Sequence, residues 1–322
     1  MKLLGMMLLA LTATLGAPVN SQSIYPVRPV HIVAPVPPGS PPDVVARVLA
    51  ERLAPALGQP VVVENRPGAS GTIGLNLVAK AAPDGYTLGI LSMPVTIVPG
   101  LFGTMPFDIA KDLAPVRQVV WAGTILVVPG ESPYRSLDEV IALAKKTPGQ
   151  LTFASGGAGT PSHIAGELLR QSIRSEIRHV PYKGAPEGVA AVMGGHVTMM
   201  FAAAGAVAPH LSAGRLRALA VPTPGRLAAF PDVPTMGEKG FPEFDVRDWL
   251  GVVAPAGTAA ATVGRLSGEI DRITAMPEVK ARFRQLGMDA VENSTPGDFN
   301  KLISSETSRW AQFVKRAGIK AD

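Results

Sequence analysis

The sequence predicts an α/β protein built from two lobes, each with a mostly parallel sheet flanked by helices. β-type runs alternate with helical patterns along most of the chain, the order that places helices between parallel strands. The 34 glycines and 31 prolines indicate many tight loops, and a hydrophobic share of 47% is large enough for folded cores. A length of 322 residues suggests about two folding units.

The first part of the chain follows this alternation twice. Residues 31–34 are a β-type run, residues 35–42 are a proline- and glycine-rich loop, and a helical pattern begins near Asp43. An acid in the first turn suits a helix start, and Gly58 ends the pattern. The next elements are a strand at 61–64, a small-residue loop at 67–71, a helix at 73–82 and a strand at 86–91.

The region from residue 119 to residue 221 repeats the same order, and three helices follow it. Its predicted strands lie at 151–154, 177–182, 197–201 and 216–221, and its helices at 137–146, 162–172 and 185–193. A proline-rich passage and an apolar segment at 249–254 lead to helices at 260–276, 278–286 and 298–315. The last helix is amphipathic, so one face should pack inward.

A second lobe inserted into the first is the economical arrangement for so many α/β units. The first lobe would comprise residues 24–120 and 246–322, and the second lobe residues 121–245. Two crossing segments, near 115–125 and 245–253, would then join the lobes and form the hinge.

The amino terminus predicts a secretory signal over residues 1–23. Lys2 precedes an apolar run at 3–17 that is too short to span a bilayer, and a polar stretch with small residues follows. No later segment resembles a membrane span, so the mature chain should be soluble. The chain has no cysteine, which leaves no lipid attachment point and no disulfide.

The charge pattern argues against nucleic acid as a partner. The net charge of +5 comes from scattered lysines and arginines, and aromatic residues make up only 5% of the chain. A mild attraction for small anions is the remaining expectation.

Three small-residue loops are the candidate binding elements, at 35–42, 67–74 and 155–162. In parallel sheets, ligands collect beyond the carboxyl ends of strands, where helix amino termini point free N–H groups at negative charge. Each loop alone is also compatible with an ordinary strand-to-helix turn. Convergence of loops from both lobes would favour a binding site.

Known catalytic and nucleotide motifs are missing. No Gly-Lys-Ser/Thr follows the glycines, no dinucleotide fingerprint has the required spacing, and there is no Gly-x-Ser-x-Gly elbow. A hydrolase would have to pair Ser155 or Ser162 with His163, but Ser162 suits a helix cap and no acid is placed by sequence to orient His163. The histidines lack metal-site spacing, so we predict no metal.

Several motifs carry a resemblance to a known family. They are YPVRP at 25–29, PVPPG at 35–39 with Asp43, LGQPVVVENRPGA at 57–69, AKAAPDGYTL at 79–88, GTP at 159–161, PYKG at 181–184, LRALAV at 216–221, FPDVPT at 230–235 and PAGT at 255–258. Over nearly all of its mature length the chain resembles the substrate-binding proteins of tripartite tricarboxylate transporters, also called Bug receptors.

The resemblance implies a periplasmic, two-lobed binding protein of the type II kind. Such a protein captures a small organic anion, a carboxylate, in an interlobe cleft and delivers it to the membrane permease subunits of the transporter. It implies no catalysis and no cofactor, and we expect a monomer. A sensor that presents ligand to a membrane signalling partner is the alternative that uses the same cleft.

The resemblance also implies a set of ligand-binding residues in the loops and strand ends. They are Pro37, Pro38, Gly39, Ser40 and Asp43; Ser70, Gly71 and Thr72; Ser92; Ser155, Gly156, Gly157, Ala158, Gly159, Thr160 and His163; and Ala202. Their expected roles are to shape the cleft and to supply hydrogen-bond donors.

The chain departs from the family pattern at two of these places. Pro41 and Pro42 stand where a second glycine is usual, and proline removes a backbone donor. Ala202 stands where the family usually has an acid, which favours a ligand without a cationic group. We therefore expect a monocarboxylate or dicarboxylate, with an aromatic acid among the candidates.

Overall fold

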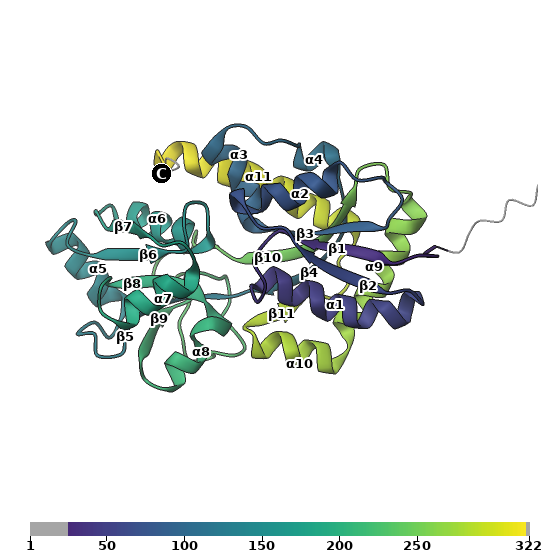
Figure 1. Ribbon diagram of the computed structural model, residues 1–322. Helices are drawn as coiled ribbons and strands as arrows, with labels where there is room; N and C mark the ends of the chain where they lie inside the picture. Colours follow the sequence, from purple (N-terminus) through teal and green to yellow (C-terminus); the bar gives the residue numbers. More distant parts are fainter. Residues whose placement is uncertain (1–24, 320–322) are drawn as a thin grey trace, which may run out of the picture.

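A computed structural model describes residues 25–319 as two α/β parts joined side by side, each with its own sheet (Figure 1). The predicted secretory signal, residues 1–23, lies outside these described residues. Within them, no helix is both long and apolar enough to cross a membrane.

The first sheet has six strands in the order β11-β4-β10-β3-β1-β2. β1 pairs in parallel with β2 and β3, whereas β10 runs antiparallel to both β3 and β4, and β11 runs antiparallel to β4. The bounds are β1 (Val30–Ala34), β2 (Val61–Asn65), β3 (Thr87–Ser92), β4 (Leu113–Ala122), β10 (Asp248–Pro255) and β11 (Met288–Ala290).

Helices cover both faces of this sheet. Side chains alternate between the faces along each strand, and apolar side chains on both faces pack against helices. Ile32 packs in one apolar cluster with α1, α9 and α10, while its neighbour Val33 packs in another with α2, α3 and α11. The bounds are α1 (Pro41–Leu57), η1 (Ala69–Gly71), α2 (Thr72–Ala79), α3 (Met93–Phe102), α4 (Ile109–Asp112), α9 (Ala260–Ala275), α10 (Pro277–Gln285) and α11 (Pro296–Ala317).

The second sheet has five strands in the order β7-β6-β8-β5-β9. β6 pairs in parallel with β7 and β8, and β5 runs antiparallel to β8 and β9. The strands are β5 (Thr124–Pro129), β6 (Thr152–Ser155), β7 (Arg178–Pro181), β8 (Met199–Ala203) and β9 (Leu216–Ala220). The helices are α5 (Leu137–Lys146), α6 (Pro161–Ile173), α7 (Ala185–Met193) and α8 (Ala204–Ser212).

The alternation of strands and helices is confirmed, but both sheets are mixed, not mostly parallel. The antiparallel strands β4, β5 and β10 lie where the chain passes between the sheets or has just returned: β4 ends at Ala122 and β5 begins at Thr124 in the other sheet. Helices α3, α4 and α8 were not predicted. The apolar sequence of α3, with prolines at 94 and 99, lacks the polar face that marks a surface helix.

The two parts touch backbone to backbone at three glycines. The N–H of Gly123, between β4 and β5, donates to the carbonyl of Gly287 at 3.1 Å, and Gly123 accepts from the N–H of Ala204 at 2.9 Å. A Cβ on Gly287 would lie 2.5 Å from the nitrogen of Gly205, and a Cβ on Gly205 would overlap the carbonyl oxygen of Leu286. Positions 205 and 287 therefore have no room for a Cβ.

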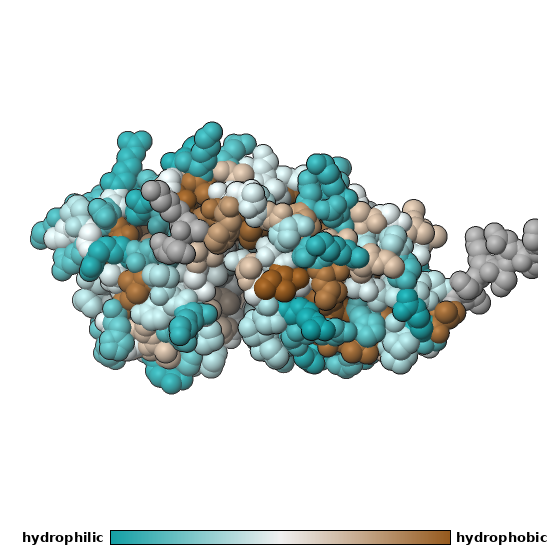
Figure 2. All heavy atoms as spheres, turned by 45° about the horizontal axis from the view of Figure 1, so that its top comes forward, coloured by the Kyte–Doolittle hydropathy of each residue, from teal (hydrophilic) through white to brown (hydrophobic). Residues whose placement is uncertain are grey.

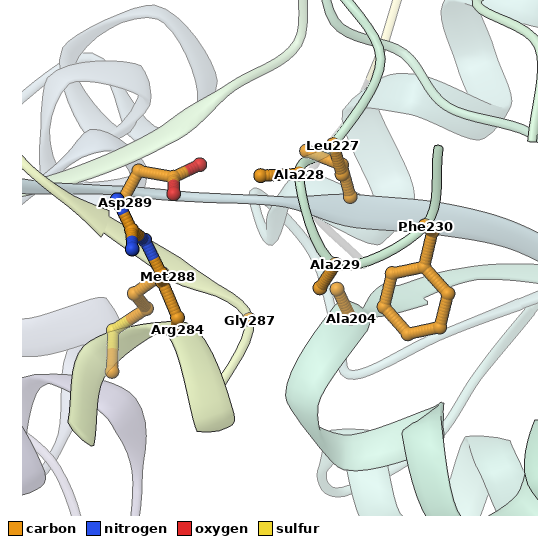
Figure 3. A pocket seen from close by; sticks show the side chains of 9 residues that line it. All are labelled: Ala204, Leu227, Ala228, Ala229, Phe230, Arg284, Gly287, Met288 and Asp289. Carbon is orange, nitrogen blue, oxygen red and sulfur yellow. The ribbon is translucent and has the colours of Figure 1, made fainter. Parts of the chain in front are cut away.

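A crevice opens beside the glycine contact, between the two parts. Figure 3 shows Leu227, Ala228, Ala229 and Phe230 on one side of it and Arg284, Met288 and Asp289 on the other. The glycine contact therefore lies at one end of residues that line the crevice, since Ala204 and Gly287 belong to both.

We expect Gly205→Ala to destabilise the protein by about 1–3 kcal/mol or more, because the new methyl group must push the backbone of α8 away from Leu286. Gly268→Ala, at an exposed position of α9, is the control: the new methyl group meets open space and should stabilise the protein by about 0.5–1 kcal/mol through helix propensity. Urea denaturation measures both. Equal stability of the Gly205 variant and the wild type would refute the close contact.

Candidate functional site

The predicted loops follow strand ends, and they converge on α3 from both sheets. Gly71 of η1 lies against α3 and the loop after β1, because a Cβ there would be 3.4 Å from Val95 and 3.5 Å from Pro35. From the second sheet, a Cβ on Gly159 would be 3.0 Å from Leu101 of α3. Figure 2 shows the surface notched between the two parts. The junction thus brings together loops that are far apart in sequence.

Asp43 organises the loop after β1. It is 2% exposed and accepts hydrogen bonds from the N–H of Gly39 (2.8 Å), from Arg47 Nε (3.0 Å) and from Asn65 Nδ2 (2.8 Å). Asn65 Nδ2 also donates to the carbonyl of Val36 at 3.1 Å. The carboxylate therefore ties the loop, the first turns of α1 and the end of β2 together. Asn65, which was not among the predicted site residues, completes this network.

The same contacts set the ionisation of Asp43. Burial alone would raise its pKa, but the hydrogen bonds from Arg47, Gly39 and Asn65 outweigh burial, so the pKa lies below its ordinary 3.8. The side chain is thus a fixed negative charge whose hydrogen-bonding capacity is used within the loop.

Pro41 and Pro42 occupy the first two positions of α1, after the N-cap residue Ser40. Neither has a backbone N–H, and the N–H of Gly39 already donates to Asp43. Pro37 and Pro38 add no donors either. This loop contributes shape to the junction and few backbone donors.

The loop after β2 and the end of β3 present small polar residues. Ser70 is exposed with a positive φ of 54°, and Gly71 follows with φ of 92°. Thr72 is buried and its hydroxyl donates to the carbonyl of Ala69 at 2.8 Å. Ser92 is 6% exposed and is the N-cap residue of α3, without a side-chain hydrogen bond to that helix.

The glycine loop after β6 is held by side chains of the same segment. Ser155 Oγ accepts from Gly157 N–H at 3.1 Å, and Ser162 Oγ accepts from Gly156 N–H at 3.2 Å. Thr160 caps α6 by accepting from the N–H of His163, and its hydroxyl donates to the carbonyl of Gly157 at 2.7 Å. The helix cap is therefore Thr160, and the expectation that Ser162 is the cap was wrong.

The two histidines near this loop, His163 and His179, contact the loop and each other. His163 is 3% exposed, its Nδ1 accepts from the N–H of Gly159 at 3.1 Å, and its ring stacks on His179 at 4.3 Å. Ser155 Oγ lies 2.7 Å from Nε2 of His179. The hydroxyl considered for a hydrolase thus hydrogen-bonds to His179, and it also belongs to the internal bonding of the loop.

Ala202 is 1% exposed and packs in the apolar core of the second sheet. Its neighbour Ala203 is partly exposed and directly precedes α8. The residue beside Ala202, not Ala202 itself, is the one with surface at the strand end.

Asp248 was not predicted as a site residue. It begins β10 and is paired with Ala122 of β4, two residues before Leu250 pairs with Ser92. Burial raises its pKa to about 7, although the backbone N–H groups of Trp249 and Met93 act to lower it. An acid at the start of the apolar run WLGVVAP was the sequence signal that could have identified it.

Among residues 25–319, no group of three or more histidine, aspartate and glutamate side chains is placed to hold a metal ion. The junction offers hydroxyl groups, backbone N–H groups and two acids, Asp43 and Asp248.

Comparison with known proteins identifies this architecture. The profile of the tripartite tricarboxylate transporter family receptors matches residues 45–319. The chain belongs to this receptor family. The receptor is similar to the periplasmic binding protein BugD, with 32% identity, a TM-score of 0.82, and coverage of 92% of this chain and 100% of BugD.

Two further similar structures contain ligands. Rpa4515 of R. palustris, solved with adipate, is 31% identical with a TM-score of 0.84, covering 92% of the receptor and 100% of Rpa4515. MatC from Rhodopseudomonas palustris, solved with bound malate, is 31% identical with a TM-score of 0.80, covering 90% of the receptor and 100% of MatC. The predicted family and two-part α/β fold are thereby confirmed.

Asp43→Asn should lower the free energy of unfolding by about 1–3 kcal/mol at neutral pH, because the buried network loses its charge and an acceptor. A carboxyl group with a lowered pKa stabilises the fold above its unfolded pKa, so this loss should shrink as the pH falls below about 4. Asp84→Asn, in the exposed pair with Arg28, should cost less than about 1 kcal/mol. Equal losses for both variants in urea titrations would contradict the network.

For Asp248 we expect the opposite dependence of stability on pH, because its pKa is raised. A carboxyl group whose pKa is raised on folding from 3.8 to about 7 makes the wild type progressively less stable as the pH rises through that range. Relative to wild type, Asp248→Asn should melt at a higher temperature at pH 8 and show no such gain at pH 4. Asp289→Asn, an exposed acid on β11, should follow the wild type. Parallel melting curves for wild type and Asp248→Asn across this range would disprove the burial of the charge.

Proposed function

We propose that the receptor is a periplasmic solute-binding protein that closes two lobes around a small organic carboxylate and presents it to permease subunits of a tripartite tricarboxylate transporter. The observation that carries this proposal is the convergence of loops from both sheets on α3. Its relatives Rpa4515 and MatC hold adipate and malate in the same fold, which supports a carboxylate ligand here. We infer that it acts as a monomer, without a cofactor and without nucleic acid.

The lobes proposed are residues 24–120 with 246–322, and residues 121–245. The membership of the sheets supports this division, because β4 and β10 belong to the first sheet and β5 to β9 belong to the second. The crossing points lie at Gly123 and just before Asp248. Rotation about these two points would open and close the junction around the glycine contact.

The donors proposed for the ligand come chiefly from Ser92, the loop after β6 and the amino terminus of α6. Backbone N–H groups at the start of a helix favour an anion, and Thr160 and Ala158 are partly exposed there. The prolines of the loop after β1 supply a wall without donors. A flat or apolar part of the ligand would therefore face that wall, and its carboxylate would face α3 and α6.

A receptor is favoured over a hydrolase because the chain belongs to a receptor family and because Ser155 is 0% exposed, so a substrate would not reach its hydroxyl. If the ligand binds only the closed conformation, binding increases the population of that conformation, which a membrane partner can recognise. Capture and release, without turnover, are the expected cycle.

In a thermal-shift screen we expect carboxylates to stabilise the receptor and neutral sugars to have no effect. Ligand at a hundredfold excess over the dissociation constant adds about 2.7 kcal/mol to stability. Thr160→Val should weaken carboxylate binding about tenfold, because the glycine loop loses the bond to Gly157.

Thr147→Val is the matched control, since its hydroxyl donates to Leu143 in α5, away from the loops that converge on α3. Its affinity should equal that of the wild type. The proposal fails if no acid in a panel of monocarboxylates, dicarboxylates, tricarboxylates and aromatic acids shifts the melting curve, or if a sugar does.

A further inference from the structure

Asp248 lies where the two sheets, β3 and the start of α3 meet. Its strand β10 pairs with β3 so that Leu250 stands beside Ser92, and α3 begins at the next residue, Met93. The backbone N–H groups of Trp249 and Met93 lie near enough to the carboxyl group to act to lower its pKa. The carboxyl group thus lies beside the start of α3, whose N-cap residue Ser92 makes no side-chain hydrogen bond to the helix.

One oxygen of this carboxyl group remains available. Oδ1 of Asp248 is buried and has no hydrogen-bond partner among the described residues. A buried polar atom without a partner is costly, so a water molecule or a ligand that supplies the missing hydrogen bond would stabilise it. Because α3 is the helix on which the loops of both sheets converge, a molecule bound there would be the natural partner for Oδ1.

Within residues 25–319, no charged side chain forms an ion pair with Asp248. Neither β3 nor α3 contains a titratable residue, and in β4 Arg117 is paired with Asp271. Arg247, the preceding residue, is held by Asp245 at 2.8 Å and stacks over Trp121 at 4.1 Å.

Charged groups on the remaining elements also lie elsewhere. On α11, Arg309 donates to the backbone of Asp245 and pairs with Glu306; on β11, Asp289 is exposed; and across the junction stand His163 and His179. Burial without a cation favours the neutral acid over the carboxylate.

We propose that Asp248 makes ligand capture proton-dependent: its neutral carboxyl group donates a hydrogen bond from Oδ1 to a ligand carboxylate at the start of α3, and its ionised form repels that carboxylate. This inference rests on the proposed function of the cleft. The proton comes from solvent when the ligand binds and returns to solvent when it leaves. The ligand class is therefore an acid bound together with one proton, without an ammonium group at this position.

The size of the effect follows from the midpoint of the titration. With a pKa of about 7, the neutral fraction falls from about nine-tenths at pH 6 to about one-tenth at pH 8. If only the neutral form binds, affinity should fall about tenfold over this range. Dicarboxylates such as adipate and malate are largely ionised throughout it, so their own titration contributes little.

The experiment is calorimetric titration of the purified mature receptor with adipate and with malate at pH 6, 7 and 8, in two buffers of different ionisation enthalpy. For the wild type we expect binding to weaken about tenfold and to take up close to one proton at pH 8. Asp248→Asn keeps a donor without a titratable group, so its affinity should vary less than twofold and resemble the wild type at pH 6. Asp289→Asn should retain the wild-type pH dependence.

Three results would overturn the proposal. A wild type whose affinity is unchanged between pH 6 and 8, with no proton uptake, would show that Asp248 does not meet the ligand. Persistence of the slope in Asp248→Asn would assign it to His163 or His179. Tighter binding at higher pH, seen with an amino acid such as aspartate, would mean that the ionised acid accepts an ammonium group.

Two further outcomes are separated by the same data. If Asp248→Asn does not fold, the wild type alone tests the proposal: a lack of proton uptake on ligand binding would refute it. If neither these probes nor any acid of the wider panel binds at pH 6, the proposed function itself fails and the inference falls with it. A wild type that binds without a pH slope leaves the proposed function standing and refutes only the role of Asp248.

Discussion

The rest of the structure depends on the way the chain passes between its two sheets. β4 ends in one sheet and β5 begins in the other with only Gly123 between them, and Gly123 bonds to Gly287 on one side and Ala204 on the other. A Cβ at Gly205 or Gly287 would clash with the facing backbone. This contact places the strand ends of one sheet opposite those of the other, so that loops from both sheets approach α3.

Asp43 and Asp248 lie at the same end of the strands of the first sheet, but their surroundings shift their pKa values in opposite directions. Asp43 receives hydrogen bonds from a guanidinium, an amide side chain and a backbone N–H, which keep it ionised and bind the loop to β2. At Asp248 the backbone N–H groups of Trp249 and Met93 act to lower the pKa, but burial is the larger effect and the pKa rises. The first acid is therefore a structural anion, whereas burial favours the neutral form of the second.

The structure shows where the residues that depart from the family pattern lie: Pro41 and Pro42 begin α1, and Ala202 lies in the core of the second sheet. Neither proline has a backbone donor, and the N–H of Gly39 already donates to Asp43, so the loop after β1 has few free backbone donors. Ala202 packs in the core, and an acid stands instead at the start of β10. In the proposed binding site, a wall with few donors would face donors at α3 and α6.

The sequence by itself determined the alternation of strands and helices, the loops at the strand ends and the family, because periodicity, glycines and contiguous motifs are local properties. Tertiary structure alone decided that β4, β5 and β10 run antiparallel, that Thr160 caps α6 and that Ser155 meets His179. It alone revealed Asp248, because burial and the loss of every cationic partner arise from elements more than a hundred residues apart in the chain, which no local pattern encodes.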